Sequence, residues 1–371
     1  MRKPTKVIGT LVGVVLILSV VRVVAVLLEL NAFREINPHF AGSCVTLSGV
    51  TGAEDVEIDH EAGIAYVSAT DRRAMSSGST GAESSDGIYL LRLAEAFDAD
   101  AAFDRLPVVG LTDFHPHGIH VRRLDDGGAR LFAVNHNAAG DSVEIFDVAD
   151  GRLVHLETIR DPLIVSPNDL VSVDAKAFYV TNDRDIPYAS RSRTFWGQIR
   201  FILLPRSLTN VVFSSGEGIA IAADGLDGAN GIAASVDASE IYISEALGKK
   251  LRIYERDSKN GLHLKETIFL GSSPDNVSVA PDGKLLIAAK PSIFKMLIAR
   301  SRRPPRPAPS QVLEVDPALP GDSASSEIYV NGGEEISAIT VSAPFVAAGG
   351  ERAFIMGNAY HGKVVVCRRD G

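Results

Sequence analysis

The chain has only two cysteines, shows no excess of basic residues, and carries no long helical pattern beyond its first thirty residues. The scarcity of thiols argues against a zinc site built on cysteine. With a net charge of -9, the chain does not show the basic character of a nucleic-acid-binding protein, so we expect no such partner. The missing helical periodicity leaves strands as the main expected element.

What the chain does contain is typical of a globular protein with many turns. Its 371 residues are 46% hydrophobic and 22% charged, with 33 glycines and 18 prolines. This length fits two or three domains, or one large β-propeller or barrel. The acidic excess also suits a chain that gathers carboxylates around a hard cation such as Ca²⁺.

A hydrophobic segment preceded by basic residues opens the chain. Basic residues at 2, 3 and 6 precede an apolar run over residues 7–30, which only Arg22 and Glu29 interrupt. This run is long enough to span a bilayer, and the charges before it predict a cytoplasmic N-terminus. We expect residues 1–30 to be an uncleaved signal-anchor, with residues 31–371 in the secretory lumen or outside the cell. A cleaved signal peptide and a secreted protein are the alternative.

A two-strand unit recurs along the rest of the chain. Each copy pairs a strand of alternating polarity with a hydrophobic strand across a turn such as DAS or PDGK, which is typical of a β-hairpin. The copies begin at Glu54, His117, Asn168, Asn230, Asp275 and, more weakly, Ile336. By subtraction of these numbers the intervals are 45 to 63 residues, which is typical of a β-propeller and predicts six blades.

The predicted fold is all-β, a six-bladed β-propeller over residues 31–371 that follows the N-terminal hydrophobic helix. Only short helices are expected elsewhere, near residues 91–97 and 190–197. A propeller must join its first and last blades, and Cys44 and Cys367 lie where that closure falls. An even pair of cysteines in a translocated domain suggests one disulfide, with two free thiols as the alternative.

Polar residues begin the first strand of most units, and in a propeller these strand starts converge on the central channel. They are Glu54 and Asp55, His117, Asn168 and Asp169, Asn230, and Asp275 and Asn276. Carboxylate and amide oxygens suit Ca²⁺. A turn role explains any one Asn-Asp pair alone, but the recurrence at one place in the unit favours a metal site.

Several motifs carry a resemblance to a known family. They are GAEDVEI after Cys44, then FHPHGI, VNHNAAGDSVEIF, PNDLV with FYVTND, GANGI and PDNVSV. In order and spacing they resemble the paraoxonase/arylesterase family of calcium-dependent lactonases, over essentially the whole chain. The resemblance implies a six-bladed propeller with two Ca²⁺ ions in its tunnel, a blade-closing disulfide and a retained hydrophobic N-terminus.

The family's metal ligands carry over onto the strand starts. The resemblance places a catalytic Ca²⁺ on Glu54, Asn168, Asn230, Asp275 and Asn276. It places a structural Ca²⁺, deeper in the tunnel, on Asp55, Asp169 and the backbone carbonyl of Ile119. Neighbouring residues at a strand start can point up and down the tunnel, so one pair can serve two ions.

The family's proposed histidine dyad falls on His117 and His136. The implied activity is the calcium-dependent hydrolysis of lactones and aryl esters, with a small-molecule substrate whose carbonyl Ca²⁺ polarises. His117 would take a proton from the attacking water, and His136 would orient it. A calcium-bound carboxylate, Glu54 or Asp275, is the alternative base.

Other residues near these motifs receive weaker expectations. His115 and His120 flank His117 in TDFHPHGIHV and are expected to have no direct role. Arg184 and Lys290 stand where histidines are common in the family, and such basic side chains should favour an acidic or polar acyl group.

Two segments are candidates for contact with lipid or a partner. Residues 188–204 resemble a family segment that walls the pocket and touches lipid, with aromatic packing over the tunnel mouth as the alternative. The SRRPPR stretch at 301–306 reads as an exposed loop, with a phospholipid or partner patch as the alternative.

Two other functions stay open. A gluconolactonase-like or strictosidine-synthase-like propeller is the nearest, although two acid-bearing pairs argue against a one-metal site. A non-catalytic, calcium-stabilised binding propeller is the alternative from a different class. The sequence indicates no oligomeric state.

Overall fold

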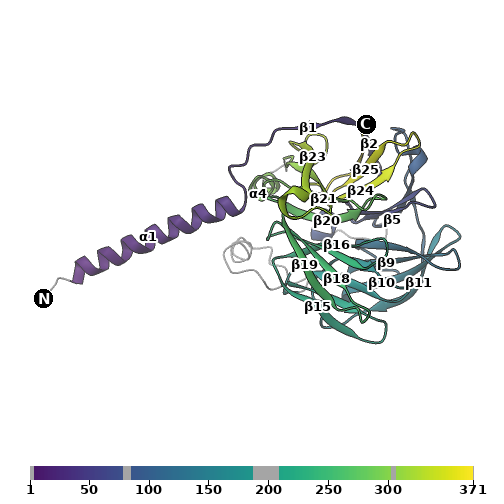
Figure 1. The fold of residues 1–371 in the computed structure, drawn as a ribbon, viewed down its shortest axis with the longest axis horizontal. Coiled ribbons are helices and arrows are strands. Elements are labelled where there is room, and N and C mark those ends of the chain that lie inside the picture. The colour runs from purple at the N-terminus through teal and green to yellow at the C-terminus, as the bar shows by residue number, and fades with distance from the viewer. Residues whose placement is uncertain (1–3, 78–84, 187–208, 302–305, 371) are drawn as a thin grey trace.

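Six sheets make up the body of the protein, and one long helix projects from it (Figure 1). The structure is a computed structural model that describes residues 4–77, 85–186, 209–301 and 306–370. The long helix is α1 (Pro4–Glu29). The short helices of the described residues are α2 (Arg72–Ser77), η1 (Leu93–Glu95), α4 (Ile293–Ser301) and η3 (Gly321–Ala324).

The first three blades follow one another along the chain. Blade 1 has β3 (Ala53–Asp59), β4 (Ile64–Ala69), β5 (Gly87–Arg92) and β6 (Asp104–Arg105). Blade 2 has β8 (Pro116–Arg123), β9 (Ala129–Asn137), β10 (Gly140–Ala149), β11 (Arg152–Ile159) and the edge strand β7 (Val108–Val109). Blade 3 has β12 (Pro167–Ser172), β13 (Phe178–Asn182), β14 (Thr209–Ser214) and β15 (Ile219–Leu226).

The last three blades complete the circle. Blade 4 has β16 (Ala229–Ala234), β17 (Glu240–Glu245), β18 (Lys250–Arg256) and β19 (Leu262–Phe269). Blade 5 has β20 (Ser273–Val279), β21 (Leu285–Lys290), β22 (Ser310–Val315), β23 (Ser325–Asn331) and the edge strand β1 (His39–Phe40). Blade 6 has β24 (Val341–Val346), β25 (Arg352–Gly357), β26 (Lys363–Arg369) and β2 (Gly42–Ser48).

The first strand of each sheet contacts the first strand of the next. The contacts run from β3 to β8, β12, β16, β20 and β24, and from β24 back to β3. This closed ring defines a six-bladed β-propeller, as the sequence predicts. Five predicted unit starts lie within two residues of an inner strand's first residue.

The sixth unit begins later than predicted. Its inner strand starts at Val341 rather than at Ile336. Residues 336–340 are buried and form a connection instead of a strand, because Ala338 has a φ of 49° that extended backbone does not allow. The short helix predicted near residues 91–97 forms as η1, whereas the one near 190–197 lies outside the described residues.

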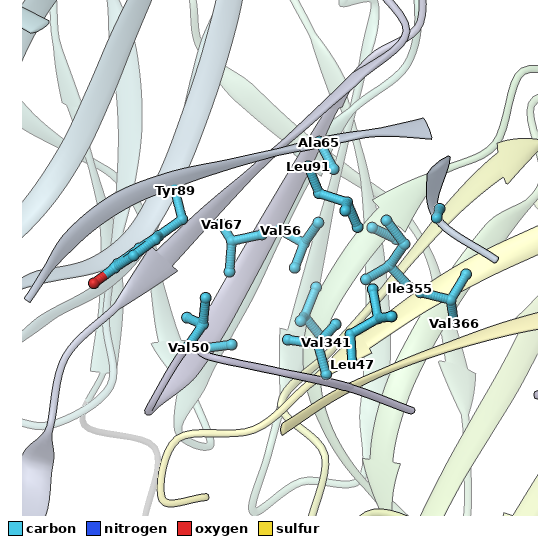
Figure 2. Close-up of a cluster of buried hydrophobic side chains, with 14 of the residues drawn as sticks. Leu47, Val50, Val56, Ala65, Val67, Tyr89, Leu91, Val341, Ile355 and Val366 are labelled. Atoms are coloured by element: carbon cyan, nitrogen blue, oxygen red, sulfur yellow. The ribbon is translucent and has the colours of Figure 1, made fainter. Parts of the chain in front are cut away.

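Hydrophobic side chains fill the space between neighbouring blades. Figure 2 shows the cluster between blades 6 and 1, where Leu47 and Val341 pack against Val56 and Leu91. Successive side chains of a strand point to opposite faces of its sheet, so alternate residues enter such a layer. This explains the apolar positions of the strands in each repeated unit. This packing holds the two ends of the chain together.

Chain closure uses the N-terminal segment as the outermost strand of the last blade. Strand β2 pairs antiparallel with β26, and Cys44 lies directly opposite Cys367 in that register. The two residues form a disulfide with a Cα–Cα distance of 4.1 Å, so the predicted bond is confirmed. Strand β1 also pairs with β23, which ties the same segment to blade 5.

Helix α1 forms where the sequence predicts a helix, and Arg22 and Glu29, which interrupt its apolar run, pair at 2.9 Å. Within the described residues, no helix combines the length and apolar character that a bilayer crossing demands. The membrane anchor therefore stays a prediction. After the helix, Asn31 Nδ2 donates to the carbonyls of Gly271 and Pro291 at 2.7 and 3.0 Å, which attaches the helix end to the propeller.

Removing the disulfide tests how much the closure contributes to stability. Reduction, or replacing both cysteines by serine, should lower the free energy of unfolding by about 3–5 kcal/mol, because the bond closes a very long loop in the unfolded chain. Urea unfolding with and without reductant measures the loss. The double serine variant is the control, since reductant should not affect it. Equal midpoints for oxidised and reduced wild type would contradict a stabilising closure.

Candidate active site

Five inner strands lose regular pairing at the residues that the sequence singles out. The irregularities span Ala53 to Asp55, Pro116 to Ile119, Pro167 to Leu170, Ala229 to Ile232, and Pro274 to Val277. A bulge leaves a residue outside the ladder and turns its side chain in a new direction. The polar residues at the strand starts can therefore aim at the axis.

Hydroxyl groups on three second strands replace the lost ladder bonds. Each hydroxyl accepts the N–H of a residue in its own blade and donates to a carbonyl in the next blade. The groups are Ser68, between Asp55 N and His117 O (3.2 and 2.5 Å); Thr181, between Asp169 N and Asn230 O (3.1 and 2.5 Å); and Ser244, between Gly231 N and Asp275 O (2.9 and 2.6 Å). These three hydroxyl groups thus satisfy backbone groups at the axis without using the side chains of the predicted metal ligands.

Two glycines allow neighbouring inner strands to approach each other. A Cβ atom at Gly118 would lie 2.5 Å from Asp169 Cα, and one at Gly231 would lie 2.5 Å from Asn276 Cα. Any larger residue would push the strands apart. These glycines, in PHGI and GANGI, therefore set the spacing between the polar residues of adjacent blades.

Four buried oxygen atoms at the axis have no hydrogen-bond partner within the described residues. They are Glu54 Oε2, Asn168 Oδ1, Asn230 Oδ1 and Asn276 Oδ1. They belong to four different blades, and all four are side chains of the predicted catalytic calcium set. An unsatisfied buried polar group costs about 1–3 kcal/mol. The cluster would therefore be stabilised by a bound group that several oxygen atoms can coordinate. A hard divalent cation fits that requirement.

A second acidic pair lies beside this cluster. The buried carboxylate of Asp55 accepts the N–H groups of Val56 and Ile119 at 2.9 and 2.8 Å, and that of Asp169 accepts those of Leu170 and Ile232 at 2.8 and 2.9 Å. This arrangement repeats in two blades and holds both carboxylates rigidly at the axis.

The charges of this pair are unfavourable without a cation. Burial, together with the charge of Glu54, raises the pKa of Asp55 to about 7. Burial and the charge of Asp55 raise the pKa of Asp169 well above its usual value. A cation between them would relieve both effects. The structure shows the N–H of Ile119 bound to Asp55, and the predicted role of its carbonyl as a ligand stays a prediction.

Neither predicted set of calcium ligands consists of carboxylates alone. Among the described residues, no three His, Cys, Asp or Glu side chains gather as metal ligands. Each predicted set contains two acids and completes its shell with amide or backbone oxygens, which is an arrangement suited to calcium rather than zinc.

The two predicted histidines are in contact. His117 Nδ1 and His136 Nε2 are 2.8 Å apart, and both residues are buried. His136 Nδ1 is 2.7 Å from Asp141 Oδ1, and His117 Nε2 is 3.3 Å from Glu54 Oε1. Together, Asp141, His136 and His117 form a chain of contacts, here called the relay, that ends beside Glu54 of the oxygen cluster.

The sequence reasoning missed Asp141, although a signal was present. Strands β9 and β10 form a tight hairpin, and its register places Asp141 directly opposite His136. The short NAAG turn in VNHNAAGD predicts a tight hairpin, in which His136 and Asp141 lie opposite each other on the two strands.

Hydrogen-bond chemistry fixes the direction of the relay. Since an ionised Asp141 can only accept, His136 donates from Nδ1 and accepts at Nε2. In its neutral form His117 then donates from Nδ1, and its Nε2 lies 3.3 Å from Glu54 Oε1, so a proton gained at Nε2 is donated to that carboxylate. Burial raises the pKa of Glu54, but His117, Arg72 and Lys290 outweigh this and bring it to about 2, so Glu54 stays ionised.

The other two histidines of the stretch are bound elsewhere. His115 lies between Asp86 and Asp113, at 2.6 and 2.9 Å, and the hydrogen bond to Asp86 raises the pKa of His115. His120 contacts Ser172 at 2.8 Å, and burial lowers the pKa of His120 to about 4. These contacts attach both histidines to neighbouring side chains, and the expectation that neither has a direct role stays a prediction.

Lys290, one of the two unusual basic residues, lies in the site. Its Nζ forms an ion pair with Asp275, and its side chain is 11% exposed. Burial and the charge of Arg300 lower the pKa of Lys290 to about 7, while Glu54 opposes that shift. Arg184 follows the end of β13 and is half-buried. Residues 188–204 and most of 301–306 lie outside the described residues.

Solved structures of other proteins share this fold. A luciferin-regenerating enzyme matches with a TM-score of 0.54 at 11% identity, over 88% of this chain and 95% of that one. A putative gluconolactonase matches with a TM-score of 0.51 at 11% identity, over 89% of this chain and 94% of that one. At such low identity these likenesses show the propeller fold alone.

Sequence comparison identifies much nearer relatives. Serum paraoxonase/arylesterase 1 of Rattus norvegicus is 30% identical over 362 residues, which cover 95% of this chain and 96% of the relative. Serum paraoxonase/lactonase 3 of the same species is 29% identical over 343 residues, covering 91% and 92%. The family model described as Arylesterase matches residues 41–368, which is nearly all of the propeller. The chain therefore belongs to the paraoxonase/arylesterase family.

Proposed function

We propose that this protein is a calcium-dependent hydrolase of lactones and aryl esters. One observation carries the proposal: the relay from Asp141 through His136 to His117 ends beside four buried oxygens that lack hydrogen-bond partners within the described residues. The names of the relatives, arylesterase and lactonase, support the same reaction class.

Two Ca²⁺ ions complete the proposed site. The catalytic ion would be held by Glu54, Asn168, Asn230, Asp275 and Asn276, and the structural ion by Asp55, Asp169 and the carbonyl of Ile119. Bound calcium supplies a Lewis acid that polarises the substrate carbonyl and stabilises developing negative charge. The fit rests on the unsatisfied oxygens and on the mutual repulsion of the buried acids.

Side chains of this protein transfer the proton of the attacking water. His117 accepts a proton from the attacking water at Nε2, and His136 shares the resulting positive charge through Nδ1 of His117. Asp141 holds His136 in the tautomer that this requires. After the ring C–O bond breaks, His117 returns the proton to the leaving alkoxide. A carboxylate that shares its charge with a cation is a weaker base than a neutral imidazole, which favours His117 over Glu54 or Asp275.

A location outside the cytoplasm is consistent with the chemistry. The disulfide requires an oxidising compartment, and the relatives carry the name serum. Helix α1 exposes apolar side chains, among them Leu16, Ile17 and Leu18 at 61%, 64% and 62%, which supports association with lipid.

Turnover measurements test the proposed reaction. The purified protein should hydrolyse aliphatic lactones and phenyl acetate, and EGTA should remove at least about 99% of that activity, because electrostatic stabilisation of this kind contributes 100-fold or more. Calcium should restore it, and magnesium should not. Absence of turnover on every substrate, in folded protein with calcium bound, would leave the non-catalytic propeller as the better account.

The relay predicts a specific effect of Asp141→Asn. An asparagine amide can donate to His136 and so select the wrong tautomer, which should lower kcat about 100- to 10,000-fold without loss of fold. Asp147→Asn is the matched control, because Asp147 lies on the same strand but pairs with Arg130. Steady-state kinetics and thermal unfolding of both variants are the measurements. A kcat for Asp141→Asn within twofold of wild type would remove the relay from the mechanism.

A further inference from the structure

One member of the predicted catalytic calcium set differs from the other four. Asp275 forms an ion pair between its carboxylate and the ammonium group of Lys290. The other four side chains each have a buried oxygen without a hydrogen-bond partner among the described residues, and they are Glu54, Asn168, Asn230 and Asn276. One ligand of the set therefore binds a cation that the chain itself supplies.

The ion pair between Lys290 and Asp275 is buried. The side chain of Lys290 is 11% exposed and that of Asp275 is 6% exposed. Exposed ion pairs contribute little to stability because water screens both charges. Little water reaches this pair, so the charge of Lys290 acts strongly on Asp275 and on any ion that Asp275 binds.

The backbone around Asp275 is held by neighbouring blades. Its carbonyl accepts the hydroxyl of Ser244, in blade 4, at 2.6 Å. The N–H of the next residue, Asn276, donates to the carbonyl of Thr340, just before blade 6, at 3.0 Å. Asp275 therefore keeps its place at the axis, whichever cation it binds.

The backbone around Lys290 is held as well. Lys290 is the last residue of β21 and pairs with Ser273 across β20 and β21. The carbonyl of Pro291 accepts a hydrogen bond from Asn31 Nδ2 at 3.0 Å, and Ser292 Oγ donates to the carbonyl of Asn31 at 2.8 Å. The ammonium group can therefore leave Asp275 only by rotation of its own side chain, and it stays close to the site.

The charge of Lys290 opposes a metal ion at the same ligands. The predicted catalytic set contains two buried carboxylates, Glu54 and Asp275, and its other members are neutral amides. A Ca²⁺ ion that binds this set either shares Asp275 with Lys290 or displaces the ammonium group. Sharing places two cations close together, and displacement leaves a buried ammonium group without its carboxylate. Both outcomes cost free energy and weaken calcium binding.

We propose that Lys290 lowers the affinity of the catalytic site for Ca²⁺ by binding Asp275, so that this ion exchanges with calcium in the surroundings. This role depends on the proposed function, because it concerns the metal that the lactonase would use. Lys290 is a positioning residue, since it acts through Asp275. A weakened site of this kind would suit the affinities of about 0.1–1 mM that extracellular calcium modules have.

Calcium binding measured without any substrate tests this role. Lys290→Met removes the charge and adds no oxygen ligand, so it should lower the dissociation constant of the catalytic ion about 10- to 100-fold. Competition with a chromophoric chelator near neutral pH measures it, and Asn230→Ala identifies which binding step belongs to the catalytic set. The structural ion should bind as in wild type, because in the described part of the chain Lys290 forms its ion pair with the catalytic set alone.

Two further variants are the controls for charge. Lys290→Arg keeps the positive charge and should keep an affinity near that of wild type. Lys284→Met removes a charge from the other end of β21, where Lys284 pairs with Glu314, and should leave both calcium affinities unchanged. Lys290→Ala is a second neutral variant that leaves room for water. It should show the same gain in affinity as Lys290→Met and replaces it if the methionine does not fit.

Thermal unfolding separates this role from simple packing. In EGTA, Lys290→Met should unfold at a lower temperature than wild type, because Asp275 loses its partner. In saturating calcium the difference should vanish or reverse, because calcium then binds Asp275 without a competing charge. A role in packing alone would lower the unfolding temperature equally in both conditions.

The outcomes distinguish this role from the function on which it depends. Unchanged or weaker calcium binding in the neutral variants, with lactones still hydrolysed, would overturn the role of Lys290 and leave the lactonase function standing. An equal loss of stability with and without calcium would overturn it as well. A folded wild-type protein that binds no calcium would overturn both.

Discussion

At the axis of the propeller, five inner strands give up regular pairing at the same place, and the structure of the site depends on those breaks. An unbroken ladder would point the polar residues alternately into the packing layers between blades. With the ladder interrupted, Ser68, Thr181 and Ser244 take over backbone hydrogen bonds and link blades 1, 3 and 4 to the blade that follows each. Four side-chain oxygens at the strand starts are then left without a hydrogen-bond partner within the described residues.

This arrangement gathers more hydrogen-bond acceptors at the axis than the surrounding donors satisfy. Partnerless amide and carboxylate oxygens from four blades lie near two acids whose pKa values burial raises. Such a cluster is unfavourable for the isolated chain, and a bound hard cation, as we propose, would relieve this cost. The low polarity of this buried region also strengthens the interactions of nearby charges, among them those of Glu54 and Lys290. The closing disulfide attaches the N-terminal segment, which precedes the first blade, to the last blade of the ring.

Much of this could be predicted from the sequence because it is local or repetitive. Strand starts, turns and the paired polar residues recur at each unit, and the two cysteines mark the closure. The partners of these residues could not be predicted in the same way. Asp141 acts through a hairpin register, the hydroxyl bridges join strands of different blades, and Lys290 reaches Asp275 across a strand pair. The predicted start of the sixth unit, Ile336, lies before the true strand start at Val341. The apolar residues of the sequence continue through a left-handed turn at Ala338, which the sequence pattern does not reveal.

The central claim is that the oxygen cluster at the axis is a cation site, and counting bound metal tests it most directly. Elemental analysis after equilibrium dialysis measures calcium per chain without reference to any substrate. The account predicts two Ca²⁺ ions per wild-type chain and one per chain in Asn230→Ala, because Asn230 belongs to the catalytic set alone. A folded wild-type protein that retains no calcium at millimolar free Ca²⁺ would contradict it.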